Sequence, residues 1–235
     1  MFGESFFLCI IKLVSNKRNE RGNKMTEMKV KKMVWPTIVG NVAILCIDMF
    51  EGCIGEDSCN SAIPIMPGAT ERMVKASALV KQGREAGIPI IVVQEMHRKD
   101  GVDFGRELDG DEGYHCLEGS GGVNPPVNEI GMTDEDYIVY KRRYSAFFHT
   151  DLELLLRGLK IETIILVGSN TDVCIHYTFV DGHQNNYFVR TPEDCIYGGS
   201  LDAHNASLKA MEYLQTGGVQ SYVSLSKAIE EYSKK

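Results

Sequence analysis

The stretch TIILVGSNTDVCIHYTFVDG, residues 163–182, contains a change of pattern that indicates the fold. Its first six residues form an apolar run that is typical of a strand buried on both faces. From Cys174 onward, the apolar residues are spaced as they are on one side of a helix. The polar residues 169–172 form a turn between the two patterns. The stretch therefore predicts a strand-turn-helix unit with a cysteine near the start of the helix.

The same alternation of strand and helix patterns recurs along the chain from residue 38 onward. Strands are expected over residues 38–48, 88–95, 136–141, 163–168 and 186–191. Helices are expected over residues 69–87, 150–160, 174–182 and 201–214, and the stretches 219–225 and 226–235 complete the series. Strands that alternate with helices imply parallel pairing through βαβ crossovers. The predicted fold is a Rossmann-like three-layer α/β/α sandwich around a mostly parallel sheet of about six strands.

The first 35 residues differ from the rest of the chain. Residues 5–14, SFFLCIIKLV, are apolar, but the run is short, is broken by Lys12 and has no basic residue before it, unlike a signal peptide. The segment that follows is charged and aperiodic, and Met25 could be the natural start of translation. We expect residues 1–35 to form a flexible extension and residues 36–235 to form one domain.

Charge and cysteine content limit the classes of partner and the compartment. A formal net charge of -7 argues against nucleic acid or an anionic membrane as the main partner. No apolar stretch approaches the roughly 18–20 residues that are needed to span a bilayer. Seven cysteines, an odd number without a CxxC pair, favour reduced thiols in the cytoplasm over a disulfide framework.

Four reactive side chains follow the predicted strands. The first, second and third strands end in Asp48, Glu95 and Lys141, and the fourth leads through the polar turn to Cys174. Ligands of open parallel sheets bind beyond the carboxyl ends of the strands. Taken singly, each residue has a structural explanation: a buried thiol, a turn cap, or one cation of a solvated Lys-Arg-Arg run. Their convergence at one sheet edge favours a reactive site.

These residue types form a chemically complete set. A thiol with an ordinary pKa near ~8.5 needs help to ionise at neutral pH, and a helix N-terminus or a nearby ammonium group supplies that help. A carboxylate can accept the thiol proton and later pass it to a leaving amine. Successive backbone amides in the turn before Cys174 could stabilise an oxyanion.

Three motifs at the strand ends resemble those of the isochorismatase-like cysteine hydrolases. They are DMFEG at residues 48–52, YKRRYSAFF at residues 140–148 and GSNTDVCIHYTFVDG at residues 168–182. The resemblance extends from about Val42 to Val223 and covers nearly all of the predicted domain.

The resemblance implies a catalytic triad of Asp48, Lys141 and Cys174 and a covalent thioester intermediate. It also implies a cis peptide between Ser169 and Asn170, which would direct the backbone amides of Asn170 and Cys174 at the oxyanion. It further implies a small-molecule amide as substrate, and homo-oligomers of two or four subunits.

Within this family, the cysteine disfavours the reaction of isochorismatase itself, which hydrolyses a vinyl ether without a nucleophilic thiol. Nicotinamidases hold a metal through an Asp-x-His motif and further histidines. This chain has Glu95, Met96 and His97 at the motif, and His115 in the following loop. Because the acid is Glu and the loop has no other histidine, we expect no metal and no other cofactor. A metal-assisted nicotinamidase is the alternative.

The loop sequences are more similar to those of relatives that cleave ureido and carbamoyl groups. These sequences are QEMHRKDGVDFGRELDG at residues 94–110 and KRRYSAFF at residues 141–148. We expect Glu95, Phe50 and Tyr144 to bind the substrate beneath a covering loop over residues 96–135. A non-catalytic binding scaffold is the competing class, but no member of the triad is missing.

The other histidines and cysteines have structural explanations. His176 lies two residues beyond Cys174, on a different helix face, and His149 is expected at a surface or interface. Cys46 is expected in the core. Three further cysteines lie in loops and show no ligand spacing: Cys53, Cys59 and Cys116.

Overall fold

The computed structural model describes residues 14–18, 24–28, 35–51, 63–120 and 123–234. The chain divides into two units, Met1–Val34 and Trp35–Lys235. In the first unit, strands β1 (Val14–Arg18) and β2 (Lys24–Met28) pair antiparallel, although the sequence pattern did not predict them. The flexibility of residues 1–35 stays a prediction.

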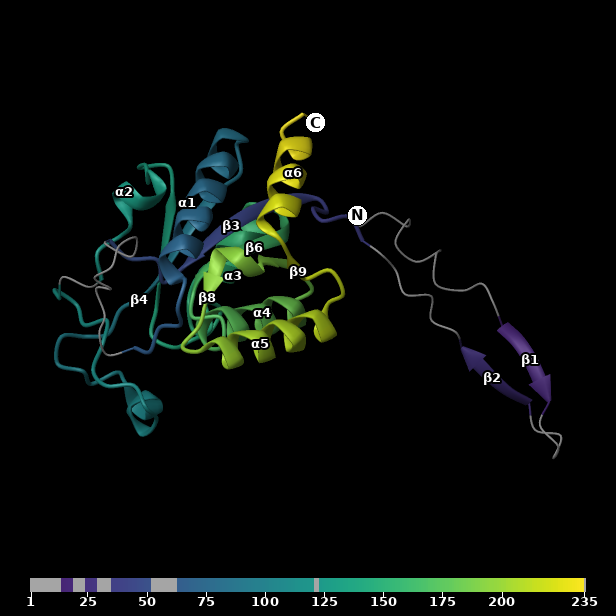
Figure 1. The fold of residues 1–235 in the computed structure, drawn as a ribbon, viewed down its shortest axis with the longest axis horizontal. Coiled ribbons are helices and arrows are strands. Elements are labelled where there is room, and N and C mark those ends of the chain that lie inside the picture. The colour runs from purple at the N-terminus through teal and green to yellow at the C-terminus, as the bar shows by residue number, and fades with distance from the viewer. Residues whose placement is uncertain (1–13, 19–23, 29–34, 52–62, 121–122, 235) are drawn as a thin grey trace. The chain divides into compact units, whose positions relative to one another are not determined.

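A seven-stranded sheet forms the centre of the second unit (Figure 1). Its order is β5-β4-β3-β6-β7-β9, β8 pairs with β6, and every pairing is parallel. The strands are β3 (Asn41–Ile47), β4 (Ile90–Glu95), β5 (Tyr137–Lys141), β6 (Ile161–Ser169), β7 (Phe188–Pro192), β8 (Ile196–Tyr197) and β9 (Val219–Gln220). The predicted parallel α/β sandwich is confirmed.

Helices flank the sheet and connect its strands. They are α1 (Ala69–Glu85), α2 (Val127–Ile130), α3 (Leu152–Gly158), α4 (Cys174–Gln184), α5 (Leu201–Leu214) and α6 (Tyr222–Tyr232), with the short 3₁₀ helices η2 (Gly105–Asp109) and η4 (Glu193–Cys195). None of the helices in the described ranges combines the length and apolar character that a membrane crossing requires.

At the C-terminal end of the domain, the sequence pattern assigned no element type to residues 219–225. The structure has β9, which contains only two residues, and α6 follows almost directly. The hydroxyl of Ser221 accepts a hydrogen bond from the amide of Ser224 and caps the helix. Leu225 and Ile229, four residues apart, bury one face of α6, so helical spacing prevails over the short apolar run.

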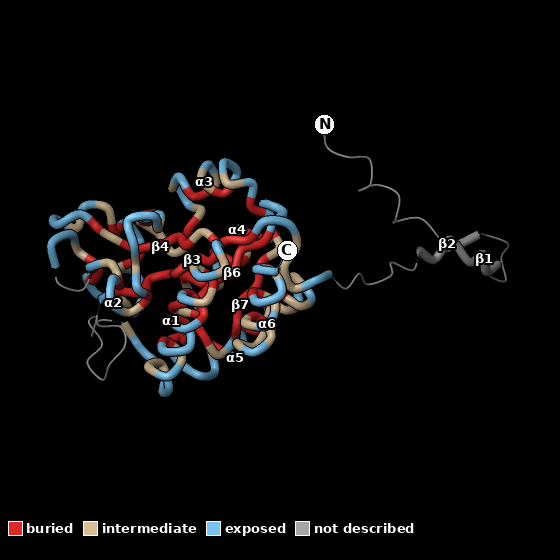
Figure 2. Tube along the Cα trace, turned by 90° about the horizontal axis from the view of Figure 1, so that it is seen from above, coloured by how far each residue is buried: buried red, intermediate tan, exposed pale blue. Residues whose placement is uncertain are grey.

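The two faces of the sheet bury separate apolar clusters. Ala43, Leu45 and Ile47 of β3 point into the cluster that contains residues of α3, α4 and α5. The alternate residues of β3, including Ile44 and Cys46, point into the cluster beneath α1 and α6. Figure 2 shows these buried strands between the outer helices. A strand buried on both faces explains the continuous apolar run in its sequence.

The carboxyl ends of β3 and β6 approach each other unusually closely. Ile47 pairs with Gly168, whose φ is 117°. A Cβ at Gly168 would overlap the carbonyl oxygen of Ile47, so the position requires glycine. This contact places Asp48, the residue after Ile47, beside the turn that leads to Cys174.

Candidate active site

The four strand-end side chains that the sequence singled out lie together. The Nζ atom of Lys141 is 2.9 Å from Oδ2 of Asp48, 2.5 Å from Oε2 of Glu95 and 3.3 Å from Sγ of Cys174. Lys141 and Glu95 are paired across β5 and β4, so the register of the sheet sets their contact. The expected convergence at one sheet edge is present.

Asp48 is oriented by a backbone contact as well as by the lysine. Its Oδ1 atom accepts a hydrogen bond of 2.7 Å from the amide of Glu95, while Oδ2 faces Lys141. Asp48 has a positive φ of 48°, which is uncommon outside glycine. Reactive atoms of Asp48, Glu95 and Cys174 all lie within 4.8 Å of one another. A proton can therefore pass between the thiol and Asp48 after small movements.

The turn before Cys174 has a conformation suited to binding an oxyanion. The peptide between Ser169 and Asn170 is cis. The amides of Val173 and Ile175 both donate to the carbonyl oxygen of Asn170, at 3.1 and 3.0 Å. Between them, the amide of Cys174 belongs to the first residue of α4, where helical amides have no acceptor within the helix. Such an amide is free to bind developing negative charge.

Contacts from β8 and α5 hold this turn in place. The amide of Thr171 donates to the carbonyl oxygen of Tyr197 at 2.7 Å. The side chain of Asp172 accepts from the amide of Gly199 at 3.0 Å. Nδ1 of His204, a buried residue of α5, lies 2.8 Å from the hydroxyl of Thr171. The sequence pattern does not single out His204, because it lies in an ordinary helical pattern 33 residues beyond Thr171.

Lys141 and Glu95 form a buried ion pair. Burial alone would lower the pKa of Lys141, but Asp48, the thiolate and Glu95 raise it well above its ordinary value. Burial alone would raise the pKa of Glu95, but Lys141 and the hydrogen bonds of His115 and His97 hold it well below its usual range. Both groups are therefore charged at neutral pH.

The pKa shifts of the Cys174 thiol and of Asp48 favour the neutral form of each group instead of the charged form. Burial raises the pKa of Cys174 well above its ordinary value, although Lys141 lowers it. Burial also raises the pKa of Asp48, although Lys141 again opposes the shift. In the resting site, the thiol keeps its proton and Asp48 is a stronger base than an exposed carboxylate.

A second cluster of titratable groups lies behind Glu95. Oε1 of Glu95 is 2.7 Å from Nε2 of His115 and 3.3 Å from Nε2 of His97. Nε2 of His97 is also 3.1 Å from Oε2 of Glu107. Burial alone would lower the pKa of His97, but Glu107 and Glu95 raise it to about 9. The sequence analysis missed Glu107, which lies in the aperiodic loop, in η2.

The donor types of this cluster fit a divalent metal ion. Candidate ligand atoms of Glu95, His97, Glu107 and His115 lie within 4.8 Å of one another, and all four residues are buried. Both carboxylate oxygens of Glu107 are buried without a hydrogen bond. Two imidazole nitrogens and two carboxylates are a suitable set for zinc. A protonated His97 would balance the same carboxylates, so the expectation of a metal-free site stays a prediction.

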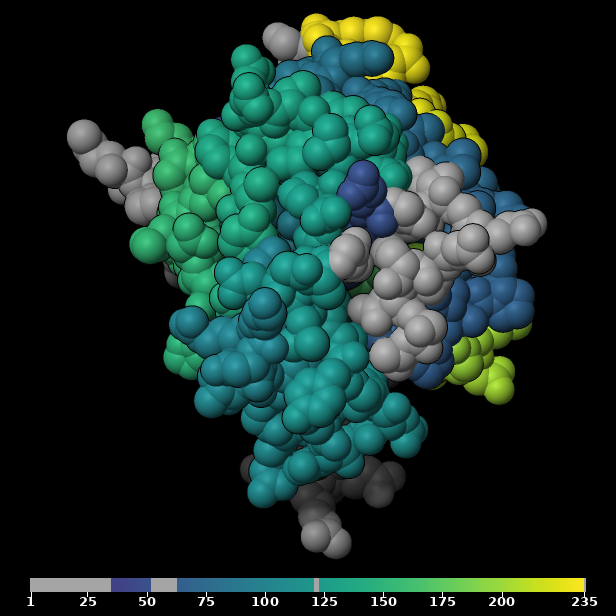
Figure 3. Space-filling model, turned by 90° about the vertical axis from the view of Figure 1, so that its left-hand side faces the viewer, coloured from purple at the N-terminus to yellow at the C-terminus, as the bar shows by residue number. Residues whose placement is uncertain are grey.

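A cavity of about 200 Å³ opens beside the turn that precedes Cys174, called here the catalytic turn after the role proposed for it. Asn170 and Val173 of the turn line it, together with Tyr144 and residues of the loop between β4 and β5. This loop covers much of the face shown in Figure 3, where it is drawn in teal. Tyr144 is thus placed to contact a substrate, and that role stays a prediction.

The other two expected substrate residues, Phe50 and Glu95, do not belong to the described lining of this cavity, and their contact with a substrate stays a prediction. Phe50 packs in a small apolar cluster with Cys116 and Val123. Glu95 does not line the cavity wall as far as the structure describes it, because its oxygens face Lys141 and the two histidines. The sequence placed Glu95 at the correct sheet edge but could not show which partners it would meet.

The remaining histidines and cysteines can now be placed. The rings of Phe148 and His149 are in contact, as are those of His176 and Tyr177. Cys46 and Cys116 are buried. Cys53 and Cys59 lie outside the described residues.

Comparison with known proteins defines the family. Residues 42–222 match the isochorismatase domain, and the chain belongs to the isochorismatase family. It is 33% identical over 86 residues to the isochorismatase family protein YaaI of Bacillus subtilis, and 35% identical over 83 residues to the ureidoacrylate amidohydrolase RutB of Acinetobacter baylyi. These alignments cover 37% and 35% of this chain. They span only 48% and 34% of the length of the two relatives.

A solved structure extends the similarity over most of the domain. It is that of an isochorismatase-like hydrolase from Alkaliphilus metalliredigens, with 28% identity and a TM-score of 0.64. The match covers 80% of this chain and 99% of that protein. The resemblance inferred from the strand-end motifs is confirmed at the level of the family.

Replacement of Lys141 by Met should shift the reactivity of Cys174 to higher pH. The positive charge of Lys141 lowers the thiol pKa, so its removal raises that pKa further and the thiolate forms only at higher pH. The measurement is the pH dependence of iodoacetamide labelling at Cys174. Arg142→Met removes a neighbouring, partly exposed cation and serves as the control. An unchanged profile in Lys141→Met would place the lysine outside the reactive site.

Proposed function

We propose that this chain is a cysteine-dependent amidohydrolase that cleaves the C–N bond of a small linear amide of the ureido or carbamoyl type. The observation that carries this proposal is the contact of one buried ammonium group, that of Lys141, with Cys174, Asp48 and Glu95. The site thus combines a nucleophile, a base and a fixed positive charge. A non-catalytic scaffold would not need these three functions together.

The first half of the reaction acylates the thiol. Asp48 takes the proton of Cys174 as the sulfur attacks the carbonyl carbon of the amide. The carbonyl oxygen becomes an oxyanion, which the backbone amides of Asn170 and Cys174 stabilise. Asp48 then donates the proton to the departing nitrogen, the C–N bond breaks, and an amine or ammonia leaves behind a thioester.

The second half hydrolyses the thioester. Asp48 accepts a proton from water as the water oxygen attacks the thioester carbonyl. Collapse of the second tetrahedral intermediate breaks the C–S bond, and the proton returns to the sulfur. The thiol is restored and the acyl group leaves as an acid. Lys141 stabilises the thiolate in both halves by its charge.

Glu95 acts on this chemistry through Lys141. Its pKa is held low by Lys141, His115 and His97, so it remains a carboxylate and offsets the lysine charge. The contact between Glu95 and Lys141 fixes the ammonium group near the sulfur. We therefore propose a positioning role for Glu95 in place of the substrate contact expected from the sequence.

The preference for a ureido or carbamoyl substrate rests on similarity. RutB, which shares 35% identity over 83 residues, is named for the hydrolysis of ureidoacrylate. The loop sequences that follow β4 and β5 are similar to those of carbamoyl-cleaving relatives. The presence of Cys174 disfavours hydrolysis of a vinyl ether, for which no thiol nucleophile is required.

A metal-assisted nicotinamidase is the second candidate, and the buried cluster around His97 favours it. Glu95, His97, Glu107 and His115 would hold a divalent ion. Such an ion, when bound, supplies Lewis-acid polarisation of a substrate group. The roles of Cys174, Asp48 and Lys141 as nucleophile, base and cation would be the same.

Cys174→Ser and Asp48→Asn should each lower turnover by about 10³-fold or more, because either change removes a step that the covalent route requires. The assay is ammonia release across biuret, ureidoacrylate, N-carbamoyl compounds and nicotinamide. Cys195→Ser is the matched control, since Cys195 is buried in the apolar cluster on the α1 side of the sheet. Turnover retained by Cys174→Ser at the wild-type rate would contradict the proposal.

Extended dialysis against a chelator should leave the rate unchanged, because no step of the proposed route requires a metal ion. The rate and the bound metal content are measured together before and after dialysis. A large loss of rate that zinc or manganese restores would favour the nicotinamidase and count against the ureido preference.

A further inference from the structure

The cavity beside the catalytic turn has an acidic wall. Four of its lining residues are carboxylates: Glu107, Asp111 and Glu112 from the covering loop, and Asp172 from the turn. No lysine, arginine or histidine lines it among the residues that the structure describes. Since Asn170 belongs to the same wall, a substrate held at the oxyanion amides would have its remaining atoms against these carboxylates.

The cations near this wall are already engaged by other groups. Lys141 lies between Asp48 and Glu95. Nη1 of Arg143 donates to the carbonyl oxygen of Asp103 at 2.7 Å and is 3.8 Å from Glu107. His97 lies 3.1 Å from Glu107, and His115 lies 3.9 Å from Glu112. These groups face carboxylates, Glu107 included, and none of them belongs to the described residues that line the cavity.

The wall also offers hydrogen-bond acceptors that a ligand can reach. Asp111 is exposed and Glu112 is half-buried. The oxygens of Glu107 are buried and face His97 and Arg143, and the amide of Gly199 already binds one oxygen of Asp172. Asp111 and Glu112 thus have acceptor capacity that a ligand with N–H donors can use.

The hydroxyl of Tyr144 donates to Oε2 of Glu112 at 3.5 Å. Burial raises the pKa of Tyr144, and Glu112, Glu107 and Glu95 add to the shift. Tyr144 therefore remains a neutral hydrogen-bond donor in the cavity.

We infer that the substrate carries N–H donors in addition to its scissile amide and that it carries no negative charge. Urea-type and amine-bearing amides without a carboxylate, such as biuret, fit this description. Ureidoacrylate and other amides that bear a carboxylate would place it against Glu107, Asp111 and Glu112, so the inference narrows the ureido class to its uncharged members. In a cavity with low-dielectric walls, fixed charges of one sign lower the local concentration of ions of the same sign. The inference rests on the proposed function, because it assigns the substrate class of the same site.

Two alkylating reagents of nearly equal size test this inference directly. Iodoacetamide is neutral and iodoacetate carries one negative charge, and both react with the thiolate at the same kind of carbon. The ratio of their second-order rate constants at Cys174 is divided by the ratio for N-acetylcysteine, which removes the intrinsic difference. We expect a normalised ratio of at least about tenfold in favour of iodoacetamide at low salt, decreasing as salt is added.

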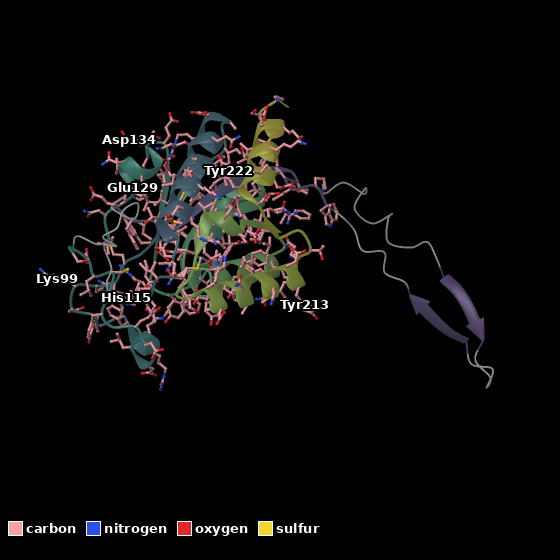
Figure 4. The ribbon with its side chains drawn as sticks, viewed as in Figure 1. Lys99, His115, Glu129, Asp134, Tyr213 and Tyr222 are labelled. Atoms are coloured by element: carbon pink, nitrogen blue, oxygen red, sulfur yellow. The ribbon has the colours of Figure 1, made fainter. Side chains whose placement is uncertain are left out.

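A double variant, Asp111→Asn with Glu112→Gln, identifies the source of the discrimination. It removes two charges from the cavity wall without altering the size of the side chains, and we expect the normalised ratio to fall severalfold. Asp134→Asn is the matched control, because Asp134 is an exposed acid near α2, in a part of the loop separate from His115 (Figure 4). This control should leave the ratio unchanged.

Each outcome has a distinct meaning. A normalised ratio near one, or faster labelling by iodoacetate, would overturn the inference. A high ratio that the double variant does not reduce would show that these carboxylates are not its source and would overturn it as well. Peptide mapping that finds Cys174 unlabelled by both reagents would instead overturn the proposed function on which the inference rests.

Discussion

The buried ammonium group of Lys141 is the constraint on which the rest of the site depends. A lysine without exposed surface would lose its charge unless carboxylates balance it. Asp48 and Glu95 supply that balance, and both come from strands of the same sheet. The ion pairs hold the carboxylate of Asp48 and the ammonium group of Lys141 close to the thiol of Cys174. The cost of burying these charges is thus offset by groups that the proposed reaction also uses.

The sheet makes this arrangement possible because parallel strands end at one edge. Glu95 and Lys141 are direct partners in the β4–β5 register, and the tight pairing of Ile47 with Gly168 brings the end of β3 to the catalytic turn. Contacts from β8 and α5 then hold the turn from the other side. Residues far apart in the chain are positioned by backbone pairing, so the geometry does not depend on flexible loops.

Because backbone pairing of the strands positions these residues, some features of the site could be predicted from the sequence and others could not. Asp48 and Lys141 follow strands with clear apolar runs, so the sheet edge and the clustering of the strand-end residues were predictable. The loop between β4 and β5 has no periodicity, and Glu107 could not be assigned to the site for that reason. His204 contacts the turn only because α5 packs beside α4, a tertiary relation that local patterns do not encode. The partners of Glu95, Lys141 among them, depend on side-chain direction and could not be predicted from the strand pattern.

The charge state of Lys141 is the most direct test of this account. Its ammonium group can be followed by NMR of protein labelled with ¹³C and ¹⁵N in lysine, with the exposed lysines as the internal reference. Burial alone would lower its pKa, whereas the carboxylates of Asp48 and Glu95 raise it, so the account predicts that Lys141 keeps its charge at pH values where the exposed lysines lose theirs. Loss of the Lys141 charge below the pH at which the exposed lysines titrate would contradict it.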